Sequence, residues 1–96
     1  MQLPTKTELR ILRVLIANGE ATGLEVVRRA DGSLARGGIY TLLGRLKDKG
    51  LVEDRTVAPP KHAGGMPRRL YKVTGTGEYL VAAIETAGQT VQLVTA

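Results

Sequence analysis

The chain has 96 residues and a mass of 10.3 kDa, which is the size of one small domain with one hydrophobic core. Apolar residues make up 43% and charged residues 24%, as in globular rather than disordered chains. With no cysteine and one histidine, the sequence offers no disulfide, no thiolate nucleophile and no convincing metal site or catalytic triad. The longest apolar run, residues 79–84, is far shorter than the roughly 18 residues of a membrane span. We therefore expect a cytoplasmic protein that is not an enzyme and needs neither a membrane nor a cofactor.

The positive charge is unevenly distributed along the chain. Fourteen basic and nine acidic residues give a net charge of +5. The stretch from residue 55 to residue 72 has no acidic residue and contains the bases Arg55, Lys61, Arg68, Arg69 and Lys72. Such a concentrated basic segment on a small globular chain favours a polyanionic partner, most often nucleic acid. By charge alone, a solvated surface that only keeps the protein soluble remains an equal alternative.

A first helix is predicted over residues 5–18. It follows Pro4 and opens with a capping box, in which Thr5 and Glu8 satisfy each other's backbone amides, and Gly19 ends it. Its apolar arc is wider than a one-sided surface helix needs and consists of Leu9, Ile11, Leu12, Leu15 and Ile16. Either the helix is central and covered on two sides by its own domain, or part of the arc meets a second subunit.

Two more helices are predicted over residues 22–30 and 36–49. A second capping box, Thr22 with Glu25, starts the first of them, and its Leu24 and Val27 are expected to face inward. The other has an apolar stripe at helical spacing, made of Ile39, Leu42, Leu43 and Leu46. Asp48 and Lys49 are interpreted as ordinary solvated charges at its end.

The opposite face of the helix over residues 36–49 consists mainly of small and polar residues. It carries Gly37, Tyr40, Thr41 and Gly44, flanked by Arg36 and Arg45. An interior glycine costs a helix about 0.5–1 kcal/mol relative to alanine, which is understandable if another molecule must approach this face closely.

The second half of the chain predicts a hairpin and a final helix. Residues 51–55 and 69–73 have strand character, and the proline- and glycine-containing segment 56–67 between them is typical of an exposed tip. The final helix, from Thr74 to Val94, has a narrow apolar seam made of Leu80, Ile84, Ala87, Val91 and Val94. This seam packs either on the first helix or on a second copy. Because the helix is about 30 Å long and overhangs a small domain, we expect a dimer interface here.

This order of elements indicates a mainly α winged helix-turn-helix fold with three helices, a two-stranded wing and a C-terminal helix. Residues 1–73 form the expected DNA-binding domain, and residues 74–96 the expected dimerisation helix. In this fold the third helix enters the DNA major groove, and the wing lies along the backbone or reaches the minor groove.

The sequence also resembles the PadR-like family of transcriptional regulators over residues 9–80. The matching motifs are residues 23–26 at the second helix, 37–46 with 50–52 around the third helix, and 67–74 with Gly77 at the wing. The resemblance implies a cytoplasmic dimeric repressor. It places Tyr40, Thr41 and Arg45 on the DNA, with Arg36 at the mouth of the helix and Lys61, Arg68 and Arg69 on the wing. Gly37 and Gly38 are also expected at the DNA, because their small size allows close approach. Arg68 and Arg69 are adjacent in a strand and point to opposite faces, so only one of them can lie squarely along the duplex, and the sequence does not say which. Where the family usually has Ser and Thr, this chain has Ala35 and Gly38, so a phosphate-binding hydroxyl and a helix cap are missing.

We therefore expect a sequence-specific regulator of transcription that binds a palindromic operator in duplex DNA as a homodimer. The alternative is a winged-helix protein–protein interaction module whose basic wing docks an acidic partner. A small-molecule effector is compatible with the sequence but is not indicated by it.

Overall fold

The computed structural model describes residues 3–32, 34, 36–59 and 64–95, and for residues 89–95 the backbone alone. Within these residues the elements, in chain order, are α1 (Lys6–Asn18), β1 (Glu20–Ala21), α2 (Gly23–Arg29), the 3-10 turn η1 (Arg36–Gly38), α3 (Ile39–Asp48), β2 (Val52–Val57), β3 (Arg68–Val73) and α4 (Gly75–Thr95). The predicted fold class is confirmed: three helices, a β-hairpin and a C-terminal helix follow one another as in a winged helix-turn-helix.

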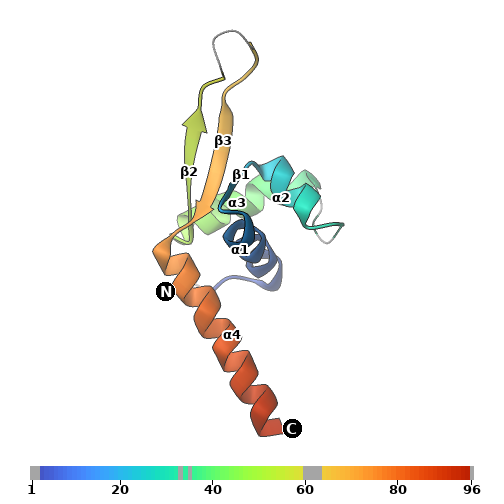
Figure 1. The fold of residues 1–96 in the computed structure, drawn as a ribbon, viewed down its shortest axis with the longest axis vertical. Helices are drawn as coiled ribbons and strands as arrows, with labels where there is room; N and C mark the ends of the chain where they lie inside the picture. Colours follow the sequence, from blue (N-terminus) through green and yellow to red (C-terminus); the bar gives the residue numbers. More distant parts are fainter. Residues whose placement is uncertain (1–2, 33, 35, 60–63, 96) are drawn as a thin grey trace.

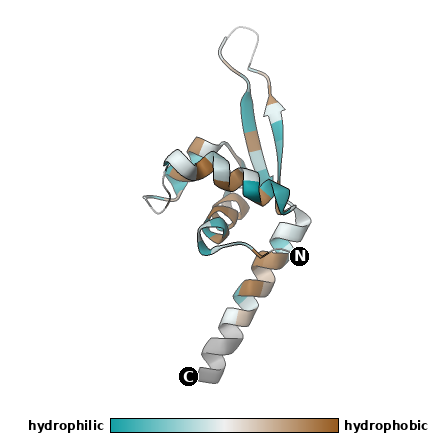
Figure 2. Cartoon of the chain, turned by 180° about the vertical axis from the view of Figure 1, so that it is seen from behind, coloured by the Kyte–Doolittle hydropathy of each residue, from teal (hydrophilic) through white to brown (hydrophobic). Residues whose placement is uncertain are grey.

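The molecule is elongated, with principal extents of 58 × 27 × 20 Å. In Figure 1 the β2–β3 hairpin projects from one end, α1, α2 and α3 cluster at its base, and α4 runs to the opposite end. Figure 2 shows hydrophobic residues gathered on the clustered helices and mostly hydrophilic residues along the hairpin. Across the described residues, every helix falls short of the length or the apolarity that a bilayer crossing requires.

Both predicted capping boxes are present and fix where α1 and α2 begin. The Thr5 side chain accepts a hydrogen bond from the Glu8 amide, and Thr22 does the same for Glu25, with both reciprocal bonds made. The third helix differs from the prediction, because its first residues form η1 and α3 begins only at Ile39. Gly38 stands at the cap of α3 and has no side chain to bond the free amides, so no side-chain cap is made there.

The sheet has a third strand that the sequence did not indicate. The order is β1-β3-β2, and all pairs are antiparallel. Ala21 pairs with Tyr71 and Val52 with Val73, which brings the hairpin's base against the end of α1. A two-residue strand such as β1 is too short to produce an alternating pattern, so only the pairing reveals it.

The core lies between α1, α3, the base of the sheet and the start of α4. Its buried hydrophobic residues are Ile11, Leu12, Leu15, Ala21, Val26, Leu34, Ile39, Leu43, Leu46, Leu51, Val52, Tyr71, Val73, Leu80 and Val81. Within the broad apolar arc of α1, Leu9 is partly buried and Ile16 is exposed. The prediction that Leu24 faces inward is wrong: the short helix α2 packs through Val26 and Val27, and Leu24 faces an open cleft.

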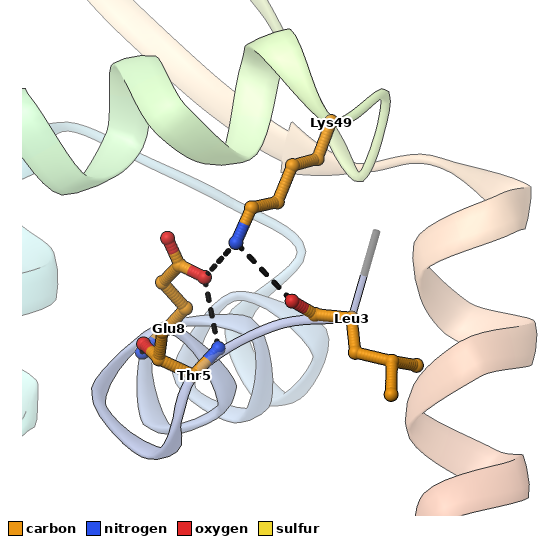
Figure 3. Close-up of polar contacts among 4 residues, drawn as sticks. All are labelled: Leu3, Thr5, Glu8 and Lys49. Carbon is orange, nitrogen blue, oxygen red and sulfur yellow. Dashed lines mark hydrogen bonds and ion pairs between the residues drawn. The ribbon is translucent and has the colours of Figure 1, made fainter. Parts of the chain in front are cut away.

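An ion pair lies inside this core. The Lys49 ammonium at the end of α3 contacts Glu8 Oε1 at 2.5 Å and donates to the Leu3 carbonyl at 3.2 Å (Figure 3). The Glu8 side chain is 1% exposed and that of Lys49 is 16% exposed, so Lys49 is not the solvated helix-end charge that the sequence suggested. The pair joins the first turn of α1 to Lys49, the residue that caps the C-terminal end of α3.

The environment of Glu8 favours its ionised form. Burial acts to raise its pKa, but the hydrogen bonds from Lys49 and from the Thr5 amide, together with the charges of Lys49 and Arg45, outweigh burial and lower it below the ordinary value of 4.5.

Replacing Lys49 by Met should lower the free energy of unfolding by about 3 kcal/mol, because the substitution leaves a buried carboxylate without its counter-charge. Urea unfolding at pH 7 measures the change. The control is Lys47→Met in the same helix: Lys47 pairs with Asp54 at 3.0 Å but is half exposed, so about 1 kcal/mol or less is expected. Equal losses in the two variants would contradict a special role for the buried pair.

Glu8 should also contribute to the acid sensitivity of the fold. Because its folded pKa lies below 4.5, its contribution is present above that pH and is lost as the pH falls through the folded pKa. The free energy of unfolding should therefore fall less between pH 6 and pH 3 in Glu8→Gln, which keeps a capping side chain, than in the wild-type protein. Glu85→Gln, in an exposed pair with Arg13, serves as control and should follow the wild-type curve. Parallel curves for Glu8→Gln and the wild type would refute the assignment.

Candidate nucleic-acid interface

Helix α3 has one buried and one exposed face. Its inner side chains Ile39, Leu43 and Leu46 are fully buried, as the apolar stripe predicted, and Leu42 is partly buried. The residues predicted for the outer face are exposed: Tyr40, Thr41, Gly44 and Arg45 on α3, with Arg36 and Gly37 on η1 just before it. Gly38 is partly buried. The core therefore fixes which side of α3 is free for a partner.

The glycines of this face are not required by the fold. A Cβ atom placed on Gly37, Gly38 or Gly44 would meet nothing within 4 Å, and none of the three has a positive φ. Their lack of side chains leaves the backbone of the face open to close approach from outside.

Gly23, by contrast, leaves room for the Tyr40 side chain. The Tyr40 side chain is 56% exposed, yet a Cβ on Gly23 would lie only 2.8 Å from Tyr40 Cε1. The first residue of α2 thus supplies the space in which the tyrosine ring of α3 rests. The nearest Tyr40 atoms are Cε1, Cζ and the hydroxyl oxygen, so the contact lies at the outer end of the ring, at the junction of the two helices.

A solvent-open cleft of about 700 Å³ lies between the two helices and the wing. Its lining comes from α2, α3 and the start of β3, and consists of Thr22, Leu24, Glu25, Arg28, Arg29, Tyr40, Pro67, Arg68 and Arg69. The fold thereby brings three predicted DNA contacts, Tyr40, Arg68 and Arg69, to the same hollow.

The arginines of the wing are paired with acids from outside the basic stretch. Arg68 contacts Glu25 at 2.8 Å, Arg69 approaches Asp54 at 3.7 Å, and Arg55 makes two bonds to Glu20 at 2.7 and 2.8 Å. The hydrogen bond from Arg55 lowers the pKa of Glu20, and Glu20 in turn raises the pKa of Arg55. The charge of the wing is therefore partly balanced within the free protein.

The arginines of α2, η1 and α3 have no such partners among the described residues. Among the described residues, no ion pair within 4.0 Å involves Arg28, Arg29, Arg36 or Arg45. Sequence reasoning left Arg28 and Arg29 out of the site, although both line the cleft. Counting charges along the chain does not find them, because only folding brings α2 beside the wing.

The remaining predicted residues are placed as follows. Lys61 lies outside the described residues. Of the predicted dimer seam, Leu80 is buried in the protomer's own core, Ile84 is partly buried against it and Ala87 is exposed. The side chains of Val91 and Val94 lie outside the described part, although the helix backbone continues through Gly88 to Thr95. No cluster of three metal-ligating side chains occurs among the described residues.

Gly44→Ala should raise the free energy of unfolding by about 0.5–1 kcal/mol, because the new methyl group meets no atom and alanine favours the helix. Thermal unfolding measures the effect. The same substitution at Gly50 is the contrasting control: Gly50 has φ +76°, so alanine there should destabilise the protein. If Gly44→Ala also lowers the free energy of unfolding, the absence of neighbouring atoms around the Gly44 position would be contradicted.

Comparison with known proteins places this geometry in a family. The chain matches the model of the transcriptional regulator PadR-like family over residues 11–83. It matches none of the curated proteins with which it was compared.

Three solved structures are similar to this one. A PadR-like transcription factor from Bacteroides fragilis is 25% identical, with a TM-score of 0.78 over 93% of this chain and 85% of that one. Bacillus subtilis PadR in complex with operator DNA is 21% identical, with a TM-score of 0.72, and the match covers 82% of this chain but 46% of that one. A PadR family regulator from Clostridium difficile is 22% identical, with a TM-score of 0.67 over 90% and 92% of the two chains. Because the family model matches well over half of the chain, from within α1 into α4, the chain belongs to the PadR-like family of transcriptional regulators.

Proposed function

We propose that this protein is a sequence-specific repressor that binds palindromic operators in duplex DNA as a homodimer in the cytoplasm, and that it is not an enzyme. The observation that carries the proposal is the outer face of α3. It combines glycines that the fold does not need with two arginines, Arg36 and Arg45, that have no ion-pair partner among the described residues. A face of this kind suits the close approach of a polyanion.

In this proposal α3 enters the major groove. Thr41 and Arg45 lie one helical turn apart and reach toward base edges, where an arginine reads guanine by two parallel hydrogen bonds. Tyr40, held against Gly23, offers its hydroxyl to the sugar-phosphate backbone beside the groove. Gly37, Gly38 and Gly44 have no side chains that would keep the helix backbone away from the floor of the major groove.

The wing and α2 supply charge for the flanking phosphates. Arg68 and Arg69 reach the backbone from β3, and Arg28 and Arg29 from α2. Lys61, which lies between β2 and β3 in the sequence and outside the described residues, is proposed as a further phosphate contact. These contacts fix register and orientation on the duplex without reading sequence, and they make affinity fall as salt rises.

The dimer is proposed to form through the outer part of α4. Leu80 is buried in the core, Ile84 is partly buried against it and Ala87 is exposed. The residues proposed to meet the second copy are Ile84, Ala87, Val91 and Val94. In Figure 1 α4 leads away from the other helices, as such pairing needs. Two recognition helices about 34 Å apart would read successive major grooves of a palindrome. A monomeric mass at micromolar concentration would contradict this arrangement.

The competing function is docking of an acidic protein onto the wing. The glycine-rich face of α3 disfavours it, because protein-binding surfaces are enriched in large aromatic side chains. The similar Bacillus subtilis PadR was solved in complex with operator DNA, which also supports DNA as the partner.

Fluorescence anisotropy with a duplex from the protein's own upstream region, and with a scrambled duplex, tests the proposal. Preference of about 10³-fold or more for the native duplex is expected. Arg45→Ala should cost about 1–3 kcal/mol on the native duplex and much less on the scrambled one. Arg10→Ala, which removes an equal charge from the exposed side of α1, is the control. Failure of the wild-type protein to bind either duplex at low salt would favour protein docking instead.

A further inference from the structure

Resting on the proposed function, we propose that Glu25 is a built-in competitor of DNA: its carboxylate occupies Arg68 in the free protein and must give way to a phosphate before Arg68 contacts the duplex. The proposal concerns a residue outside the predicted DNA contacts, which sets how strongly the wing binds.

The geometry of the cleft supports this role. Arg68 Nη2 lies 2.8 Å from Glu25 Oε1, although the two residues are 43 positions apart in the chain. Glu25 is the one acidic residue among the nine that line the cleft, where four are arginines. The Glu25 carboxylate therefore occupies a position to which the arginines of the cleft would attract a phosphate of the duplex. Carboxylates and phosphates both form charge-assisted hydrogen bonds with arginine, so the two groups can compete for Arg68.

The pair is built to exchange. The Arg68 side chain is 64% exposed and that of Glu25 is 31% exposed, and solvent-screened pairs of this kind hold only weakly. Glu25 also keeps a second set of partners, because the same oxygen accepts from the Thr22 hydroxyl at 3.0 Å and from the Thr22 amide at 3.4 Å. Release of Arg68 therefore leaves the capping box of α2 intact.

The competition has a defined signature. Phosphate contacts carry no direct sequence information, so the penalty from Glu25 falls equally on native and scrambled duplexes. Each arginine that gains a phosphate steepens the dependence of affinity on salt by about 0.9 in the log–log slope. In the wild-type protein the Glu25 carboxylate competes for Arg68 and so reduces the increase in salt dependence that the Arg68–phosphate contact would give.

Glu25→Gln tests the proposal, since glutamine also serves in a capping box and thermal unfolding verifies that the fold is kept. We expect binding about 2–5-fold tighter on both duplexes, the range for loss of an exposed ion pair, and a slope steeper by up to about 0.9. The matched control is Glu85→Gln, whose pair with Arg13 joins α1 to α4 away from the cleft and which should bind like the wild type. In an Arg68→Ala background, Glu25→Gln should have no more effect than the control.

Three results would overturn the proposal while leaving DNA binding intact. Weaker binding by Glu25→Gln would mean that Glu25 positions Arg68 instead of competing for it. Unchanged binding would mean that the pair has no role. An equal gain in the Arg68→Ala background would mean general charge repulsion. No binding by the wild-type protein is a separate outcome, because it refutes the proposed function itself.

The wild-type protein provides a readout that needs no variant. On addition of the native duplex, the carboxyl carbon resonance of Glu25 should shift as Arg68 leaves, while that of Glu85 should stay in place. A Glu25 resonance that does not move in the saturated complex would contradict the exchange.

Discussion

The buried ion pair between Glu8 and Lys49 is the constraint on which the arrangement of the helices depends. The Glu8 side chain is only 1% exposed, and a buried carboxylate needs a paired positive charge. Lys49, the residue that caps the C-terminal end of α3, supplies that charge. The same carboxylate closes the capping box of α1, and the same ammonium holds the Leu3 carbonyl (Figure 3). The beginning of α1 and the end of α3 are thereby fixed together, and with them the direction in which the outer face of α3 points.

Electrostatics divides the rest of the molecule into balanced and unbalanced regions. The basic stretch from residue 55 to residue 72 has no acid of its own, yet folding supplies Glu20, Glu25 and Asp54 to its arginines. The arginines of α2 and η1–α3 stay without such partners among the described residues, whereas the arginines of the wing are paired with acids. This division links local ion pairs to the way a duplex would be bound.

The sequence predicted most of the fold because its signals are local. Two capping boxes set the starts of α1 and α2, and the apolar stripe of α3 identified its buried face. One miss is local: residues 36–38 form η1, and α3 begins only at Ile39. The other misses depend on contacts between distant segments: the two-residue strand β1, the exposure of Leu24 and the pairing of Lys49. The candidate site follows the same rule. Periodicity found the exposed face of α3, whereas the addition of Arg28 and Arg29 to the cleft required the wing to be folded against α2.

The central claim is that the exposed face of α3 and the adjoining cleft form the surface that contacts DNA. Amide chemical-shift mapping by NMR, with the native duplex titrated into the labelled protein, tests it most directly. The largest shift changes are expected at residues 36–45, 23–29 and 67–69, with small changes over the exposed side of α1. Changes concentrated on α1 or along α4, with residues 36–45 unaffected, would contradict it.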